Sequence, residues 1–169
     1  FANRDKAIVL LAVNTGLRVG ELVGLNIADL VNGSGAIKNE LLIRKEIAKG
    51  KKERTVPLND KAKAAIQTLI DFNKSMGYAW QPVSPLIAGR KGRLSTVHVE
   101  RIVKALCVSA NLDIAVTPHV FRHTFATGVL KKTQNLRIVQ ILLGHSNVST
   151  TCIYTHPTRE DLALAVNAL

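Results

Sequence analysis

Three residues of types that could do chemistry together follow a Thr-Pro pair at 117–118. The pair predicts a helix start, because Thr caps free backbone N–H groups and Pro suits the first helical position. His119, Arg122 and His123 come within the next turn. Side chains three or four positions apart share one face of a helix, so two imidazoles and a guanidinium can point the same way.

Two more candidates follow a second predicted helix, 135–143. Gly144 ends that helix, His145 sits in the turn, and Tyr154, one of only two tyrosines, comes nine residues later. Phosphoryl transfer without a metal needs a nucleophile, fixed positive charge around the phosphate, and an acid for the leaving oxygen. A Tyr hydroxyl, an Arg fork and His side chains can fill these roles. The set therefore predicts attack of a side-chain oxygen on a phosphate ester.

Three rival chemistries are poorly supported. His119 and His123 have the ligand spacing of a zinc helix, but the accompanying Glu is missing and Arg122 would set a cation beside the metal. No GxSxG motif occurs, which argues against a serine hydrolase. The glycine turn TGLRVG lacks the Lys-Ser/Thr ending of a phosphate-binding loop. We therefore expect no metal and no cofactor.

The composition indicates the class of partner. The 169 residues carry a net charge of +11 with a pI near 10.1, which favours a polyanion bound through its phosphates. Aromatic residues make up only 4%, too few for a base-stacking single-strand binder. The sequence contains no long apolar run of the kind that crosses a membrane. Double-stranded DNA is the expected partner.

The remaining pattern is mainly helical, in one domain of adequate size for a core. Asn3 is expected to cap a first helix that Gly16 ends, and Arg18 opens a short second one. Apolar stripes predict further helices; Ala64, Ala65, Leu69 and Phe72 form the expected core stripe of the first of them. These helices cover 60–75, 96–110, 118–132, 135–143 and 159–168, with a short one carrying Tyr154 between the last two.

The stretch from Ile27 to Leu58 is expected to be strand. Segments 40–48 and 53–58 flank a basic turn, so we expect a β-hairpin or a three-stranded antiparallel sheet. The tip contains Lys49, Lys51 and Lys52, which either solubilise the turn or reach a phosphate. The fold class is therefore mainly α with a small antiparallel sheet, an α+β arrangement.

A loop from Tyr78 to Arg93 contains a second basic group. Arg90, Lys91 and Arg93 either clamp a phosphate or form a solvated loop. Trp80, in the same loop, is expected to be a core anchor. The two cysteines, Cys107 and Cys152, lack a CxxC spacing and are interpreted as buried thiols of a reducing cytoplasm.

Four segments together resemble the catalytic domain of the tyrosine recombinases, the phage integrase family. They are TGLRVGEL at 15–22, KGKKERTVPL at 49–58, TPHVFRHTFAT at 117–127 and LLGHSNVSTTCIYTH at 142–156. The resemblance spans nearly the whole chain, 1–169, and implies a catalytic domain without the N-terminal DNA-clamping domain that the family usually carries. Since the chain begins at Phe1 rather than Met, we expect it to be an excised domain.

The resemblance also implies roles for individual residues. Arg18 and Arg122 would hold the scissile phosphate, and His119 and His145 would stabilise the transition state and move protons. Tyr154 would attack to give a 3′-phosphotyrosyl intermediate and a free 5′-hydroxyl, with no metal or ATP. A hairpin lysine would protonate the leaving hydroxyl; Lys49 matches best, while Lys51 and Lys52 stay open. His123 is assigned a structural role.

The assembly implied by the resemblance is a tetramer on two DNA duplexes, and a monomer without DNA. Residues 159–169 would dock on a neighbouring subunit or pack on their own domain. Two alternatives stay open: a basic DNA-binding domain without catalysis, and a type IB topoisomerase or telomere resolvase. The expected location is the cytoplasm of a bacterial or archaeal cell, for a protein encoded by the cell or by a phage.

Overall fold

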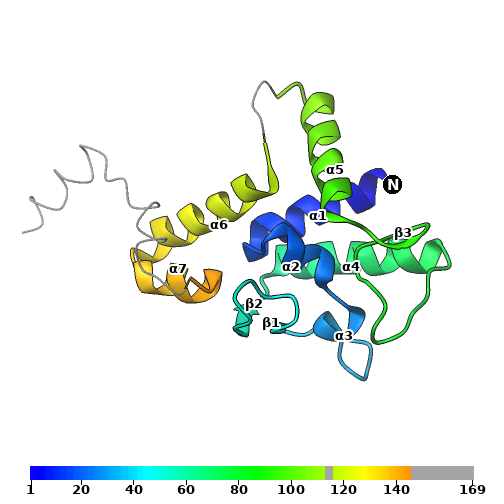
Figure 1. The fold of residues 1–169 in the computed structure, drawn as a ribbon, viewed down its shortest axis with the longest axis horizontal. Helices are drawn as coiled ribbons and strands as arrows, with labels where there is room; N and C mark the ends of the chain where they lie inside the picture. The colour runs from blue at the N-terminus through cyan, green and yellow to red at the C-terminus, as the bar shows by residue number, and fades with distance from the viewer. Residues whose placement is uncertain (113–115, 146–169) are drawn as a thin grey trace, which may run out of the picture.

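The structure is a computed structural model that describes residues 1–112 and 116–145. Within these ranges the chain is mainly helical, with two small antiparallel hairpins (Figure 1). This confirms the predicted fold class. In chain order the elements are α1 (Ala2–Thr15), α2 (Val19–Gly24), α3 (Ile27–Leu30), β1 (Glu40–Ile43), β2 (Arg54–Pro57), α4 (Asp60–Ser75), β3 (Ala88–Gly89), β4 (Gly92–Arg93), α5 (Thr96–Ser109), α6 (Pro118–Thr133) and α7 (Leu136–Leu143).

The main core forms around α1, which packs against α4, α5 and α6. Ile8 and Leu11 of α1 are buried, as are Ile66 and Leu69 of α4. Burial of such side chains is the main favourable term in folding, at about 25 cal/mol per Å² of apolar surface. The predicted stripe on α4 was right for Leu69, but Ala64 is exposed.

A second, much smaller core holds α7 to α6. Its fully enclosed members are Ala126, Val139 and Leu143, with Phe125 and Val129 packed around them. Figure 1 shows that α7 and the far half of α6 extend away from the body formed by α1, α2 and α4. So small a core gives α7 little apolar attachment to that body, which leaves room for polar contacts to set its position.

Several helix ends agree with the sequence predictions. Asn59 caps α4 by accepting a hydrogen bond from the Ala62 N–H at 2.8 Å, and Asn135 caps α7 in the same way. Gly16 and Gly144 follow α1 and α7 with φ of 63°, in the left-handed region that favours glycine. The predicted cap at Asn3 was wrong, because α1 already begins at Ala2.

The main hairpin pairs β1 with β2, and Ile43 lies opposite Arg54. It is two-stranded, so the three-stranded alternative is not found in the described part of the chain. The first strand was predicted to reach residue 48 but ends at Ile43, since a turn follows in which the N–H groups of Ile47 and Ala48 donate to the Arg44 carbonyl. The lysine-rich tip is thus the end of a longer turn.

The strand prediction also missed α3. Asn26 precedes this helix, and its N–H donates to the Asp29 carboxylate at 2.8 Å. Carboxylates at the third helical position commonly bind the N-cap N–H in this way. One turn of helix therefore forms where an apolar-rich stretch suggested strand.

Two predicted burials were wrong. Trp80 is 40% exposed, and the Lys74 ammonium lies 5.0 Å from the centre of its ring. Cys107 is half-buried, and Cys152 lies outside the described residues.

The predicted loop 78–93 also contains the short β3–β4 hairpin, which has Arg90 and Lys91 at its turn. The α3 region, through Asn26, bridges to Pro85 of this loop.

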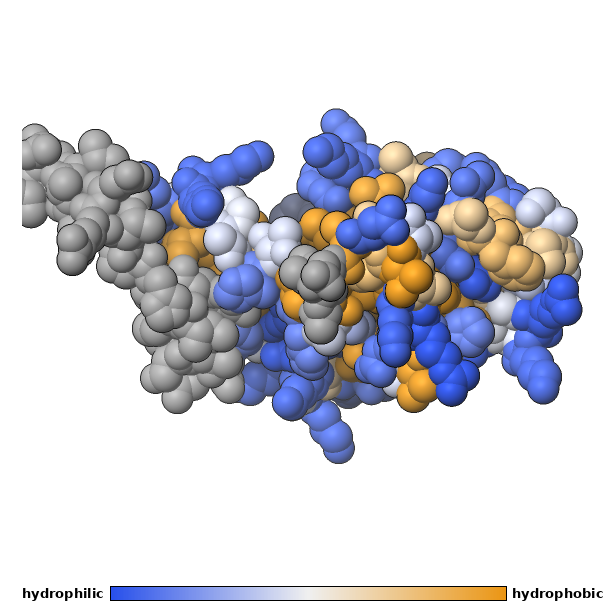
Figure 2. All heavy atoms as spheres, turned by 90° about the horizontal axis from the view of Figure 1, so that it is seen from above, coloured by the Kyte–Doolittle hydropathy of each residue, from blue (hydrophilic) through white to orange (hydrophobic). Residues whose placement is uncertain are grey.

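The surface mixes charged and apolar side chains. Figure 2 shows hydrophilic side chains projecting around the edges of the view, with apolar atoms exposed between them. Among the described residues, Val83 and Val108 are the most exposed large apolar residues, at 74% and 70%. In the described part of the molecule, the helices are too short or too polar to cross a membrane.

Candidate active site around Arg122

Arg122 joins three distant parts of the chain. It lies in α6, is 95% buried, and its Nη1 donates to the Gly16 carbonyl at 2.7 Å. Its Nη2 donates to the Leu143 carbonyl at 2.6 Å. Gly16 ends α1 two residues before Arg18, and Leu143 ends α7 two residues before His145. These two hydrogen bonds therefore gather Arg18, Arg122 and His145, as the sequence analysis required.

His145 lies among several positive charges. Burial, and after it the charges of Arg122, Arg18 and Arg54, together lower its pKa from 6.5 to about 4. Its backbone N–H donates to the Gln140 carbonyl at 3.1 Å, and the Gln140 side chain donates back to the His145 carbonyl. The imidazole is thus neutral at pH 7 and held just beyond the end of α7.

Glu21 and Arg54 belong to the same cluster, and the sequence analysis assigned them no role. The Glu21 side chain is only 1% exposed. Arg54 Nη1 and Nη2 donate to its two oxygens at 2.8 and 2.6 Å, and the Arg18 Nη1 donates at 3.2 Å. Burial pushes the pKa of Glu21 upward, but the hydrogen bonds and charges of Arg54 and Arg18 hold it below its usual value.

One sequence signal could have pointed to this pair. Glu21 stands three residues after Arg18, the spacing at which a carboxylate binds the N-cap N–H of a helix. The Arg18 N–H does donate to Glu21 at 2.9 Å. Nothing local identifies Arg54 as its partner, because the two residues are 33 positions apart.

His119 and His123, the two histidines in the first turns of α6, are both exposed. His119 is one turn before Arg122 and lines a cavity of about 610 Å³ together with Val19, the neighbour of Arg18. The wall of this cavity also includes Lys104, Cys107 and Val116. His119 therefore lies at the edge of the cluster, on the side of α2 and α5, whereas His123 is one turn further along α6.

The lysines of the hairpin tip are exposed at the turn between β1 and β2. Gly50 and Lys51 both have positive φ, 82° and 53°. The turn leads directly into Arg54 of the cluster, so its C-terminal stem is anchored there. Lys49, Lys51 and Lys52 thus lie on the exposed turn, outside the group that Arg122 and Glu21 join.

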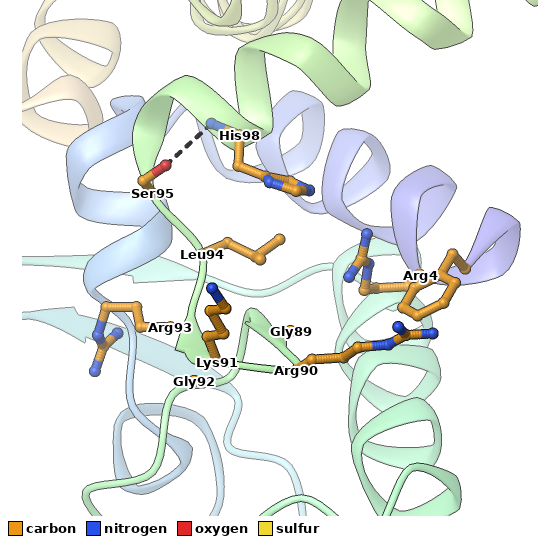
Figure 3. A pocket seen from close by; sticks show the side chains of 10 residues that line it. Arg4, Gly89, Arg90, Lys91, Gly92, Arg93, Leu94, Ser95 and His98 are labelled. Atoms are coloured by element: carbon orange, nitrogen blue, oxygen red, sulfur yellow. Dashed lines mark hydrogen bonds between the residues drawn. The ribbon is translucent and has the colours of Figure 1, made fainter.

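The second basic group surrounds a different pocket, shown in Figure 3. This pocket has a volume of about 520 Å³ and lies between the β3–β4 turn, α1 and the start of α5. Arg4, Arg90, Lys91 and His98 contribute to its lining. Arg4 is buried and pairs with Asp5 at 2.6 Å, while Arg90 and Lys91 are exposed.

Arg93 differs from its two neighbours in this group. Its guanidinium donates to the carbonyls of Val23 and Leu25 and to the Asn26 side chain, and it points away from Arg4 in Figure 3. Burial, followed by the nearby charge of Arg44, lowers the pKa of Arg93. These contacts bind the β3–β4 hairpin to α2 and α3 and give Arg93 a structural task that its sequence position did not reveal.

Some predicted features lie outside the described residues. They include Tyr154, Cys152, the predicted helix that carries Tyr154, and the segment 159–169. Within the described ranges, His, Cys, Asp and Glu side chains form no group of three or more that could hold a metal ion. In the same part of the chain, the candidate site is a cluster of five residues with His119 at its edge. The five are Arg18, Glu21, Arg54, Arg122 and His145.

Comparison with known proteins gives a consistent result. The model of the phage integrase family matches residues 1–161. Tyrosine recombinase XerC of Thermodesulfovibrio yellowstonii is 41% identical over 159 residues, covering 90% of this chain and 50% of that protein. Tyrosine recombinase XerD of Halalkalibacterium halodurans is 35% identical, covering 94% and 51%. The chain thus spans about half the length of the curated relatives it matches.

Solved structures agree with these matches. The crystal structure of XerA recombinase superposes with a TM-score of 0.77 at 33% identity, covering 98% of this chain and 58% of that one. XerH site-specific recombinase, solved in a post-cleavage complex with its palindromic difH substrate, has a TM-score of 0.77 at 27% identity, covering 97% and 45%.

Proposed function

The chain belongs to the phage integrase family, and from this premise we propose that it is the catalytic domain of a site-specific DNA recombinase. The observation that carries the proposal is the pair of hydrogen bonds from Arg122 to Gly16 and Leu143. They bring together the segments that carry Arg18, Arg122 and His145, although Gly16 and Arg122 are 106 positions apart in the chain. A cluster of fixed cations with a neutral imidazole is suited to a phosphodiester.

In the proposed reaction the Tyr154 hydroxyl oxygen attacks the scissile phosphorus. A bond forms between the phenolic oxygen and phosphorus, and the bond between phosphorus and the 5′ oxygen breaks. The phenolic proton passes to a base of the site, and the 5′ oxygen takes a proton from a hairpin lysine. Lys49 is the first candidate, followed by Lys51 and Lys52. The energy of the phosphodiester is kept in the phosphotyrosyl ester, so religation needs no ATP.

Arg18 and Arg122 would stabilise the charge that develops on the non-bridging oxygens. Arg suits this task because its planar fork stays charged and donates two parallel hydrogen bonds. His119 and His145 would donate or accept protons around the same oxygens. Positive charge also favours the phenolate form of Tyr154, whose free pKa is about 10.

His145 is well placed for proton transfer that depends on bound DNA. Its pKa of about 4 reflects burial and then three neighbouring guanidiniums. A phosphate between Arg18 and Arg122 brings a negative charge that opposes this repulsion, so its binding raises the pKa of His145. The imidazole would then gain proton-donating character only when the substrate is in place.

Binding would extend beyond the scissile phosphate. The net charge of +11 favours duplex DNA through release of counterions, so affinity should fall steeply with salt. Arg90 and Lys91, exposed beside the pocket of Figure 3, are candidates for phosphate contacts. We propose a monomer in the absence of DNA and a tetramer on two duplexes during strand exchange.

A nicked duplex tests the proposed chemistry. Nicked fragments of a genomic library trap a covalent adduct because the short strand that carries the 5′-hydroxyl diffuses away. The wild-type chain should form an adduct that survives denaturing electrophoresis, and Tyr154→Phe should form none. Tyr78→Phe is the matched control, since Tyr78 is the other tyrosine and lies half-buried against Phe72.

Two outcomes would contradict the proposal. Salt-sensitive binding without an adduct would indicate a DNA-binding domain without catalysis. Relaxation of supercoiled plasmid without preference for any site would indicate a topoisomerase. Sequencing of the adduct junctions identifies the target site in the successful case.

A further inference from the structure

Arg54 contacts two of the segments that build the site and belongs to a third. It is the first residue of β2, directly after the lysine-rich turn. Its Nη1 and Nη2 bind Glu21 of α2, and its Nε donates to the Leu142 carbonyl in the last turn of α7 at 3.0 Å. All three nitrogens of this guanidinium are thus engaged in holding protein groups.

The pair with Glu21 is nearly sealed from water. The side chains of Arg54 and Glu21 are 7% and 1% exposed. A buried carboxylate that loses its bidentate partner must find another cation or take up a proton. The nearest other cation is Arg18, whose Nη1 donates to Glu21 at 3.2 Å, a longer hydrogen bond than the 2.8 Å bond from Arg54 Nη1. Arg54 therefore neutralises Glu21 and leaves the charge of Arg18 available to a substrate.

The contact with α7 fixes the place of His145. The last carbonyls of a helix have no partner within it, and here guanidiniums bind two of them: Arg54 at Leu142 and Arg122 at Leu143. Among the described residues, the apolar attachment of α7 is a small cluster on α6, so these two bonds connect the end of α7 to the body of the domain.

The approach of Arg54 to this helix end is close enough to restrict the sequence there. A Cβ built on Gly144 would lie 2.7 Å from the Arg54 Cδ, and φ at Gly144 is +63°. Glycine is therefore required at this position for two independent reasons. One is the left-handed backbone, and the other is the side chain of Arg54.

We propose that Arg54 is a positioning residue of the recombinase site, which holds Arg18 and His145 in register with the hairpin that carries the lysines. The inference rests on the proposed function for its catalytic consequence. Its structural half, the coupling of α2, α7 and the hairpin, can be measured in the protein without DNA.

The same hairpin supplies a matched control. Arg44 follows β1 and binds Asp29 through Nε and Nη2 at 2.7 and 3.0 Å, a second bidentate pair with a buried carboxylate. Arg44→Met and Arg54→Met thus each remove one guanidinium from one end of the same hairpin. Only the second removes a bond to α7.

Amide hydrogen exchange of the free protein, followed by NMR, tests the coupling. The Arg18 and His145 N–H groups donate to Glu21 and to the Gln140 carbonyl. In Arg54→Met both should exchange at least about tenfold faster, as expected for loss of hydrogen bonds to a charged group. In Arg44→Met both should keep their wild-type rates, while the Asn26 N–H, which donates to Asp29, exchanges faster.

Arg54→Lys separates the two contacts and also serves if the Met variant does not fold. Its ammonium can pair with Glu21 but cannot bridge to Leu142 at the same time, since Lys lacks the planar fork. The Arg18 amide should then keep its protection, whereas the His145 amide loses it. Equal protection of His145 in Arg54→Lys and Arg44→Met would overturn the proposal.

The catalytic consequence is measured with the nicked duplex captured by the wild-type chain. Arg54→Met should slow single-turnover adduct formation by at least about tenfold, because small misplacements of reacting groups are costly. DNA affinity should change by less than about twofold. A cleavage rate like that of Arg44→Met would overturn the catalytic part. If the wild-type chain forms no adduct, the proposed function fails, and hydrogen exchange alone decides the role of Arg54.

Discussion

The short helices α2 and α3 begin in the same way. In each, a carboxylate at the third helical position accepts a hydrogen bond from the N–H of the residue before the helix. The Arg18 N–H donates to Glu21 at 2.9 Å, and the Asn26 N–H donates to Asp29 at 2.8 Å. Such carboxylates satisfy a backbone donor that the helix itself cannot, and they complement its dipole.

Helices α2 and α3 are also alike in their tertiary contacts. The hairpin presents one arginine from each of its two strand ends, and each arginine binds one of these carboxylates with two hydrogen bonds. Arg54 binds Glu21 and Arg44 binds Asp29. The hydrogen bonds to Asp29 raise the pKa of Arg44 further above its ordinary value. Two equivalent clamps therefore attach one hairpin to two consecutive helices.

The two clamps differ in burial and in what lies beyond them. Arg54 is 7% exposed and Arg44 is 29% exposed. The remaining donor of Arg54 reaches across to α7, whereas Arg44 donates to Gly24 at the end of the adjoining helix α2. The same local device thus serves attachment alone at α3, and attachment plus construction of the site at α2. The two arginines differ because the fold places α7, held by α6, beside Arg54.

The largest expected effect is the difference in stability between variants of the two carboxylates. Glu21→Gln should lower the free energy of unfolding by about 3 kcal/mol, because it leaves the buried Arg54 without its counter-charge. Asp29→Asn should cost about 1 kcal/mol, since Arg44 is partly exposed and solvent replaces part of the lost interaction. Urea denaturation of both variants measures the difference. Equal losses would mean that the two clamps are energetically equivalent.

An intermediate effect concerns pH. The folded pKa of His145, about 4, is below its ordinary 6.5, so the unfolded chain binds more protons between these values. Stability should therefore fall as pH drops from 6.5 to 4, and the depressed pKa of Glu21 adds to the loss below its ordinary value of 4.5. Melting temperatures measured between pH 7 and 4 follow the effect.

Two histidine variants place this pH dependence in the molecule. In His145→Gln the melting temperature should change less between pH 6.5 and 4 than in the wild-type chain, because the variant has no imidazole to charge at that position. His98→Gln, on α5 beside the pocket of Figure 3, should retain the wild-type slope. An unchanged slope in His145→Gln would show that the acid sensitivity arises elsewhere.

The smallest expected effect concerns the glycines that α2 contains and α3 lacks. Gly20 is exposed, and a Cβ there would meet nothing within 4 Å, so Gly20→Ala should stabilise the domain by about 0.5–1 kcal/mol. A Cβ on Gly24 would lie 2.6 Å from the Ile47 side chain, so Gly24→Ala should destabilise it. Thermal denaturation with opposite signs for the two variants is the expected result.

Features that depend on neighbouring residues could be predicted from the sequence. The bounds of α4 were correct at both ends, because Asn59 caps the helix and the apolar period is regular. Gly16 and Gly144 were correctly placed at helix ends. The prediction that Arg18, Arg122 and His145 converge rested on the resemblance to a family, and the geometry bears out that convergence.

Features that depend on distant residues could not be predicted in this way. Trp80 and Arg93 have ordinary loop surroundings in the sequence, and their exposure or engagement follows from which elements pack beside them. Helix α3 was missed since one capping carboxylate outweighed the β-like composition of its region. The tip lysines were identified, but the turn that presents them begins earlier than predicted.

By itself, the amino-acid sequence determined the family, the helical character and most of the residue types in the site, because capping, periodicity and motif spacing act over a few positions. Only the tertiary structure decided that Glu21 and Arg54 belong to that site and that α7 is tied to the body by guanidiniums. The physical reason is that a buried ion pair and an unpaired helix carbonyl are satisfied by whichever group the fold brings near. Here that group is 33 positions away for Glu21 and 88 for Leu142.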